Sequence, residues 1–180
     1  MVFKASSPNA KVLGRNILIY LSGMGAFEMM GRSIIEAHGI DPNPKEEEWY
    51  NFQNFLDALK EIAEKTGKST ITMMGTRVAT FAKFSPEINT LEQALQELSL
   101  SYHKVHQDDL SSSKEYIKVE DNKYKVIIKT PYPCDFDLGY LRGLVKRFIP
   151  QTFTRVIHDD NEPCRAKGAE SCTYWIMVDV

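Results

Sequence analysis

The spacing of apolar residues changes near position 107, and this change constrains the fold more than any other feature of the sequence. Before it, apolar side chains recur at steps of three and four residues, which predicts helices over about 9–38, 46–67 and 90–107. The first of these contains Gly23 and Gly25, which indicate a break. Residues 1–107 are therefore expected to be mostly helical.

The rest of the chain alternates apolar and polar residues, as strands with one buried face do. Segments 116–119 and 124–129 alternate in this way, and the polar residues between them predict a hairpin. A helix is expected over about 135–148, and two further strands over 153–158 and 173–180. This order predicts an α+β fold, in which the helical half packs on a four- or five-stranded antiparallel sheet with an inserted helix.

Length and composition describe an ordinary globular chain. Its 180 residues, 43% of them hydrophobic, predict a single domain over 1–180, with a helical part (1–107) and a sheet part (108–180). A net charge of −2 argues against a nucleic-acid partner. No run of about 20 apolar residues could span a membrane. The N-terminus lacks a secretion signal and the cysteine count is odd, so a cytoplasmic location is expected.

Three cysteines, Cys134, Cys164 and Cys172, lie in the sheet part. Gly168 stands midway between the last two, where it lets the backbone reverse and the two thiols converge. The third thiol begins a predicted helix. Three thiols and a carboxylate or histidine suit a structural zinc site, although the thiols also fit as small buried apolar groups.

From Pro131 onward the chain resembles the vinyl-4-reductase family of small-molecule-binding domains. The matching residues are Cys134, Gly139-Tyr140, Gly143, Cys164, Gly168 and Cys172. The pattern is also similar to the sensor domains of phenol-responsive bacterial activators, whose zinc is held by three cysteines and a glutamate. Asn161 occupies the position of that glutamate here, and its neighbour Glu162 is the residue that we assign as the fourth ligand. Asp160 and His158 are also near.

The resemblance implies a non-enzymatic sensor that binds a small hydrophobic or aromatic molecule. Phe27, Trp49 and Phe52 are the aromatic residues of the helical half that we expect to line its pocket, although such residues also make an ordinary core. The family further implies a homodimer, formed through the N-terminal helix, and a downstream signalling protein.

Two histidines, His103 and His106, lie three residues apart and share a helix face, and both are candidate ligand-binding residues. The family is related in fold to haem-nitric-oxide-binding domains, in which His103 would correspond to the haem ligand. This relationship implies a haem-based gas sensor as the alternative function. The Tyr-x-Ser-x-Arg motif of those domains is replaced by Tyr132-Pro133-Cys134-Asp135-Phe136.

Two further hypotheses come from the same resemblance. One is a structural adaptor similar to Golgi-trafficking components, which would have no cavity. The other is a role in tetrapyrrole vinyl reduction, for which the chain has no hydride-donor site. No phosphate-binding loop, nucleophile elbow or Cys-x-x-Cys motif occurs, so we expect no enzymatic activity.

Overall fold

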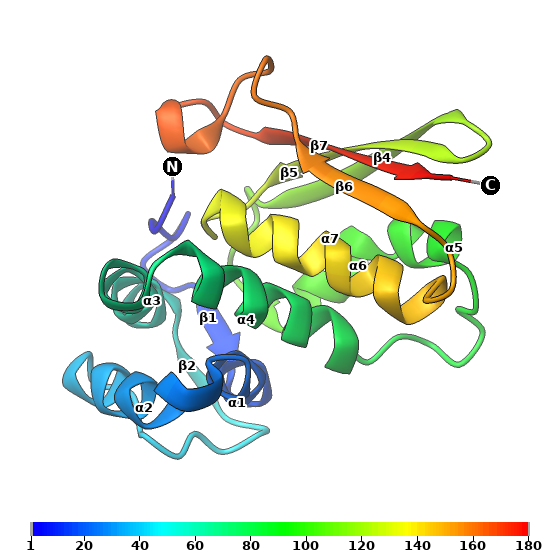
Figure 1. Ribbon diagram of the computed structural model, residues 1–180. Helices are drawn as coiled ribbons and strands as arrows, with labels where there is room; N and C mark the ends of the chain where they lie inside the picture. Colours follow the sequence, from blue (N-terminus) through cyan, green and yellow to red (C-terminus); the bar gives the residue numbers. More distant parts are fainter. Residues whose placement is uncertain (1, 180) are drawn as a thin grey trace.

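The computed structural model describes residues 2–179 and confirms the α+β fold (Figure 1). Its helices are α1 (Gly14–Ser22), α2 (Glu28–Ala37), α3 (Phe52–Thr66), α4 (Lys68–Phe81), α5 (Leu91–Gln96), α6 (Leu98–His103) and α7 (Cys134–Phe148), with short 3-10 turns at Gly25–Phe27 and Arg165–Lys167. Its strands are β1 (Lys11–Leu13), β2 (Trp49–Asn51), β3 (His106–Gln107), β4 (Ser113–Glu120), β5 (Lys123–Lys129), β6 (Thr154–His158) and β7 (Cys172–Val178).

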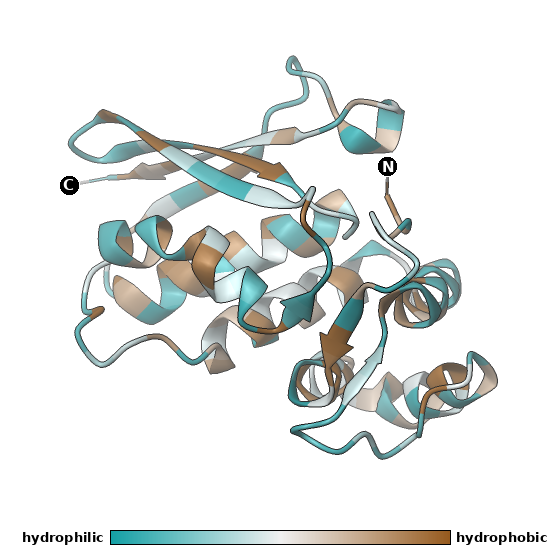
Figure 2. Cartoon of the chain, turned by 180° about the vertical axis from the view of Figure 1, so that it is seen from behind, coloured by the Kyte–Doolittle hydropathy of each residue, from teal (hydrophilic) through white to brown (hydrophobic). Residues whose placement is uncertain are grey.

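The larger sheet has the antiparallel order β4-β5-β7-β6, which confirms the predicted four-stranded sheet with an inserted helix. Along β5, buried residues alternate with partly exposed ones, as in a strand with one buried face. Figure 2 shows hydrophobic segments both on the strands and on the helices. A second sheet, of order β2-β1-β3, was not predicted. Its strands have only two or three residues, too few for alternation to be visible in the sequence.

The helical half differs from the prediction at its helix ends. The expected break at Gly23–Gly25 is present, between α1 and the 3-10 turn. The acidic residues Glu46–Glu48 do not begin a helix, because Trp49–Asn51 pairs with β1 and the helix begins only at Phe52. The helix predicted over 90–107 is divided at Glu97 and ends at His103, because the residues after it turn to form β3 beside β1.

Helix α7 lies beneath the larger sheet, and α4 lies beside α7 on the side away from the sheet (Figure 1). Their backbones approach closely because glycines face the contact. A Cβ atom on Gly139 would lie 2.0 Å from the Thr72 carbonyl oxygen, and one on Gly75 would lie 2.1 Å from the Phe136 carbonyl oxygen. The Thr76 hydroxyl donates a hydrogen bond to the Gly139 carbonyl across this contact, at 3.1 Å. This packing holds the first turns of α7 against the helical half.

One continuous apolar core joins α1, α3, α4 and α7 to the inner face of the larger sheet. Its aromatic members come from both halves of the chain, and several of them line a cavity inside the protein. Within residues 2–179, none of the helices has the length and apolar character needed to cross a membrane.

Candidate functional site

Cys134, Cys164 and Cys172 converge at one end of α7. The Sγ atoms are 3.3 Å apart for Cys134 and Cys172, and 3.5 Å apart for the other two pairs. Cys134 opens α7, Cys172 opens β7, and Cys164 precedes the 3-10 turn. Gly168 ends that turn with a φ of 92°, the left-handed conformation that lets the chain reverse between the two thiols.

The fourth potential donor is His158, at the end of β6. Its ligand nitrogen and the three sulfur atoms all lie within 4.8 Å of one another. Asp160 contacts His158 Nδ1 at 2.8 Å, whereas His158 Nε2 is buried and has no hydrogen-bond partner among residues 2–179. A carboxylate on Nδ1 orients metal-binding histidines in this way. The structure places Glu162, the expected fourth ligand, outside this group, because it pairs with Lys125 Nζ at 3.2 Å.

The charges around the three thiols favour one thiolate. A hydrogen bond with Cys134 and the guanidinium of Arg165 lower the pKa of Cys172, and the same hydrogen bond raises the pKa of Cys134. The Arg165 backbone N–H donates to Cys172 Sγ at 3.3 Å, and its Nε donates at 3.4 Å. These donor types and their spacing fit a tetrahedral zinc ion with four protein ligands, which would leave no open coordination position for water.

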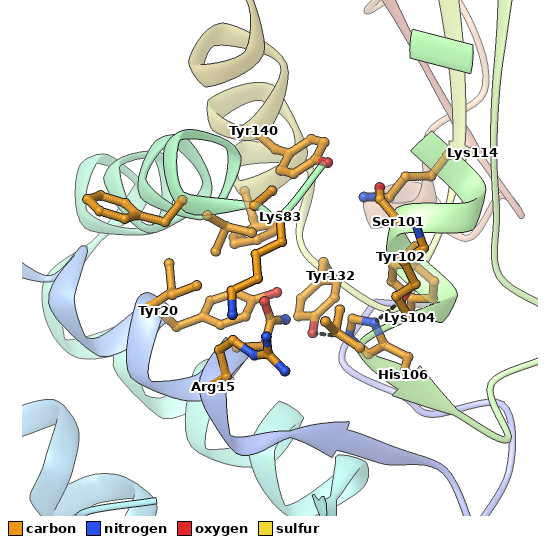
Figure 3. A pocket seen from close by; sticks show the side chains of 17 residues that line it. Arg15, Tyr20, Lys83, Ser101, Tyr102, Lys104, His106, Lys114, Tyr132 and Tyr140 are labelled. Atoms are coloured by element: carbon orange, nitrogen blue, oxygen red, sulfur yellow. Dashed lines mark hydrogen bonds between the residues drawn. The ribbon is translucent and has the colours of Figure 1, made fainter. Parts of the chain in front are cut away.

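A cavity of about 280 Å³ lies between α1, the end of α4, α6, β3, β4 and the start of α7. Most of its wall is aromatic or aliphatic. The rings of Tyr20, Tyr132 and Phe136 stack against one another, with centroids 4.8 to 5.5 Å apart. Figure 3 shows Tyr20 and Tyr132 at this wall. Arg15, Lys83 and Lys104 also line the cavity and bring positive charge to it.

His106 is the imidazole that lines this cavity, and it is buried. Its Nδ1 lies 2.9 Å from the Tyr102 carbonyl oxygen, and its Nε2 lies 2.7 Å from the Tyr132 hydroxyl (Figure 3). A carbonyl can only accept, so Nδ1 carries the proton, and in the neutral ring Nε2 accepts from the Tyr132 O–H. Burial lowers the pKa of His106 to about 3, so the ring is neutral at physiological pH.

Lys114 reaches the same cavity from β4. Its side chain is buried, and its Nζ lies 4.2 Å from the centroid of the Tyr140 ring and 5.2 Å from that of Tyr102. Burial lowers the pKa of Lys114 to about 8. The cavity therefore combines an aromatic wall, a neutral imidazole and a buried amine.

The other residues that were expected from the sequence to bind the ligand do not line this cavity. His103 is exposed and does not line the cavity, because α6 ends there and β3 begins only at His106. Phe52 is buried behind the wall, with its ring 4.9 Å from that of His106. Phe27 is 46% exposed and Trp49 lies on β2, and neither lines the cavity.

Sequence reasoning missed Tyr20, Tyr132, Tyr140 and Lys114 as cavity residues. A signal existed for Lys114. It lies two residues before Tyr116 on β4, and strand alternation puts both on the same face of the sheet. No comparable signal identified Tyr20, which comes from α1 and meets α7 only in the folded protein.

Comparison with solved structures shows the same fold in H-NOX domains. An H-NOX protein from S. oneidensis in the Fe(II)NO ligation state superposes with a TM-score of 0.68 at 15% identity, covering 93% of this chain and 99% of that one. An Fe(II) unliganded H-NOX mutant from K. algicida gives 0.68 at 12% identity, and a Cs H-NOX mutant gives 0.69 at 14%. Each covers 93% of this chain and 97% of the other.

No model of a protein family matches the sequence, and no curated protein matches it either. These structural neighbours bear out the expected likeness in fold to haem-nitric-oxide-binding domains; they do not show membership of the vinyl-4-reductase family or similarity to trafficking components. The chain therefore has the H-NOX fold.

Proposed function

We propose that this chain is a non-enzymatic sensor domain that holds haem in the cavity beside His106 and responds to a diatomic gas. The resemblance in sequence implied this function as the alternative. The similar structures favour it over the non-haem sensor, since they are described in Fe(II), Fe(II)NO and Fe(II)CO states. The observation that carries the proposal is a buried, neutral imidazole on the wall of a largely apolar cavity.

The residues around the cavity fit haem in their chemistry. His106 Nε2 would hold the haem iron, and its Nδ1 already bonds to a backbone carbonyl, an arrangement that orients metal-binding histidines. Arg15, Lys83 and Lys104 would supply positive charge to the two propionates. Haem would supply an iron centre that binds a diatomic gas. His103, the ligand expected from the sequence, is exposed and so is a weaker candidate.

The Tyr132 hydroxyl gives the domain a means of signalling. It donates to His106, and a ligand on Nε2 would displace it. The carbonyl of the same residue accepts from Arg165, whose Nε donates to Cys172. A change at the cavity is thereby connected to the cysteine cluster at the base of α7.

We also propose that Cys134, Cys164, Cys172 and His158 bind one structural zinc ion, which would join the start of α7 to β6 and β7. The unpartnered His158 Nε2 supports this set over the one with Glu162. The signal would pass to a partner protein through contacts. A homodimer remains a prediction; the N-terminal helix expected to mediate it is divided into α1 and α2.

A second candidate is the non-haem sensor for a small aromatic molecule. Three observations favour it. The Tyr132–His106 hydrogen bond occupies the imidazole nitrogen that haem iron would need, and about 280 Å³ is at the small end for a ligand pocket. The Tyr-x-Ser-x-Arg motif is also absent, with Phe136 in the position of its arginine. The adaptor hypothesis predicts no cavity, so the cavity argues against it.

Absorption spectroscopy and metal analysis of untagged protein, before and after loading with hemin, test these proposals. A Soret band that is lost in His106→Ala and kept in His103→Ala supports the haem sensor. The absence of any Soret band after loading contradicts it and leaves the aromatic-ligand sensor. About one zinc per chain, lost in a Cys164→Ser/Cys172→Ser variant, supports the structural metal.

A further inference from the structure

Lys114 is a buried cation on the wall of the cavity, and the proposed haem and zinc sites do not use it. The residue is 7% exposed, and Figure 3 shows its side chain directed from β4 toward Tyr140. Across residues 2–179 its amine has no hydrogen bond or ion pair; its contacts are the faces of two tyrosine rings. Lysines are rarely buried unless they are paired.

Two buried carboxylates lie in this region, and neither contacts the amine directly. Asp137 pairs with the guanidinium of Arg165 through Oδ2, and its buried Oδ1 has no hydrogen-bond partner within residues 2–179. Asp109 accepts hydrogen bonds from Tyr102, Ser112 and Ser6. The charged groups that act on Lys114 are Asp137 and Arg165, which have opposite signs. No carboxylate within residues 2–179 forms an ion pair with the Lys114 amine, so its charge faces the cavity without a direct partner.

We propose that Lys114 is the carboxylate-binding residue of this cavity, so that its ligand is a planar aromatic molecule carrying an acid group. The cavity supplies the amine and the π-faces of Tyr102 and Tyr140 around it. A carboxylate entering beside the amine would form a charge-assisted hydrogen bond in a site shielded from water, where such bonds are strong. With a pKa of about 8, the amine is mostly protonated at pH 7 and suited to an anion.

This inference rests on the proposed function only in that the cavity binds a ligand. The carboxylate has two possible sources: a propionate of haem, or the acid group of a small aromatic molecule. In either case Lys114 takes part of the role of the serine and arginine that the Tyr132–Phe136 segment lacks.

The first experiment measures by calorimetry the binding of naphthoate and of naphthylmethanol, which has the same ring system without the charge. We expect wild-type protein to prefer naphthoate. Lys114→Met should weaken naphthoate binding about ten- to hundredfold and leave naphthylmethanol within about twofold, because methionine keeps the length of the side chain and removes the charge. Lys118→Met is the matched control. It removes the same charge from the same strand, at a residue that pairs with Glu92 on the surface.

The second experiment compares hemin with hemin dimethyl ester, followed by the Soret band. Lys114→Met should weaken hemin binding and leave the ester unaffected if a propionate is the source. Tight naphthoate binding without a Soret band identifies a small aromatic acid instead, and it contradicts the haem proposal alone. Circular dichroism of each variant verifies that it is folded.

Two outcomes overturn the inference. In the first, wild-type protein binds hemin or the naphthyl compounds, and Lys114→Met either lowers the affinity for charged and uncharged ligands equally or changes neither affinity. Lys114 then does not recognise a carboxylate, and the proposed sensor function stands. If wild-type protein binds none of the probes, both the inference and the proposed function are wrong.

Discussion

Replacing Lys114 by methionine should make the ligand-free protein more stable at neutral pH. Burial lowers the pKa of this amine from 10.5 to about 8, so the folded state disfavours its charged form. At about 1.36 kcal/mol for each pH unit, this difference corresponds to about 3.4 kcal/mol of destabilisation. The contact of the amine with the Tyr140 ring offsets about 0.5–2 kcal/mol of it. The net gain for Lys114→Met at pH 7 is therefore about 1.5–3 kcal/mol.

The pH dependence of the stability gain distinguishes the removal of a buried charge from an improvement in packing. The folded-state pKa of Lys114 is below its unfolded value, so the penalty is fully present below about pH 8. It is relieved as the pH rises from about 8 to 10.5, where the unfolded chain also loses the proton. The stability advantage of Lys114→Met should accordingly shrink over this range.

Urea unfolding followed by circular dichroism at pH 7 and at pH 10 measures both effects. Lys118→Met, on the exposed part of β4, should change the free energy of unfolding by no more than about 0.5 kcal/mol at either pH. A Lys114→Met variant that is no more stable than wild type at pH 7, or whose advantage is the same at both pH values, would show that the amine is not an unpaired buried charge. An anionic ligand would then no longer be expected.

Three further predictions concern other parts of the molecule. His158→Ala should lower the zinc content of purified protein, whereas Glu162→Ala should leave it unchanged; the reverse result in metal analysis would restore the ligand set expected from sequence. Gly139→Ala should destabilise the fold by about 1–3 kcal/mol in urea unfolding, because the added methyl group would meet the Thr72 carbonyl, and an unchanged midpoint would refute the close contact of α4 and α7. Because the pKa of His106 is lowered to about 3, the folded protein resists its protonation, so stability should fall as the pH decreases below 6.5. His106→Gln should reduce this pH slope, and an unaltered slope would contradict burial of the neutral ring.

The sequence alone was sufficient to predict the strands and the helix of the sheet half, although not the order of the strands in the sheet. The hairpin of β4 and β5, helix α7 and the pair β6–β7 were predicted close to their observed ends. Each is a segment in which the period of apolar residues is strong and local. The convergence of Cys164 and Cys172 also follows from local chemistry, since Gly168 adopts the left-handed conformation that the reversal needs.

Tertiary structure decided the site itself. Whether His103 or His106 faces the cavity depends on where α6 ends. The pairing of β3 with β1 sets that end. The paired residues are about a hundred positions apart, so local periodicity does not reveal the contact. The choice between Glu162 and His158 depends likewise on the pairing of β6 with β7 and on Lys125, which holds the glutamate away. Strand alternation places Lys114 on the same face of the sheet as Tyr116, but only the packing of α6 and α7 over that face buries its amine. Local sequence determines which segments form helices and strands, but the charge and hydrogen-bonding state of a buried group depend on neighbours that only the folded chain brings together.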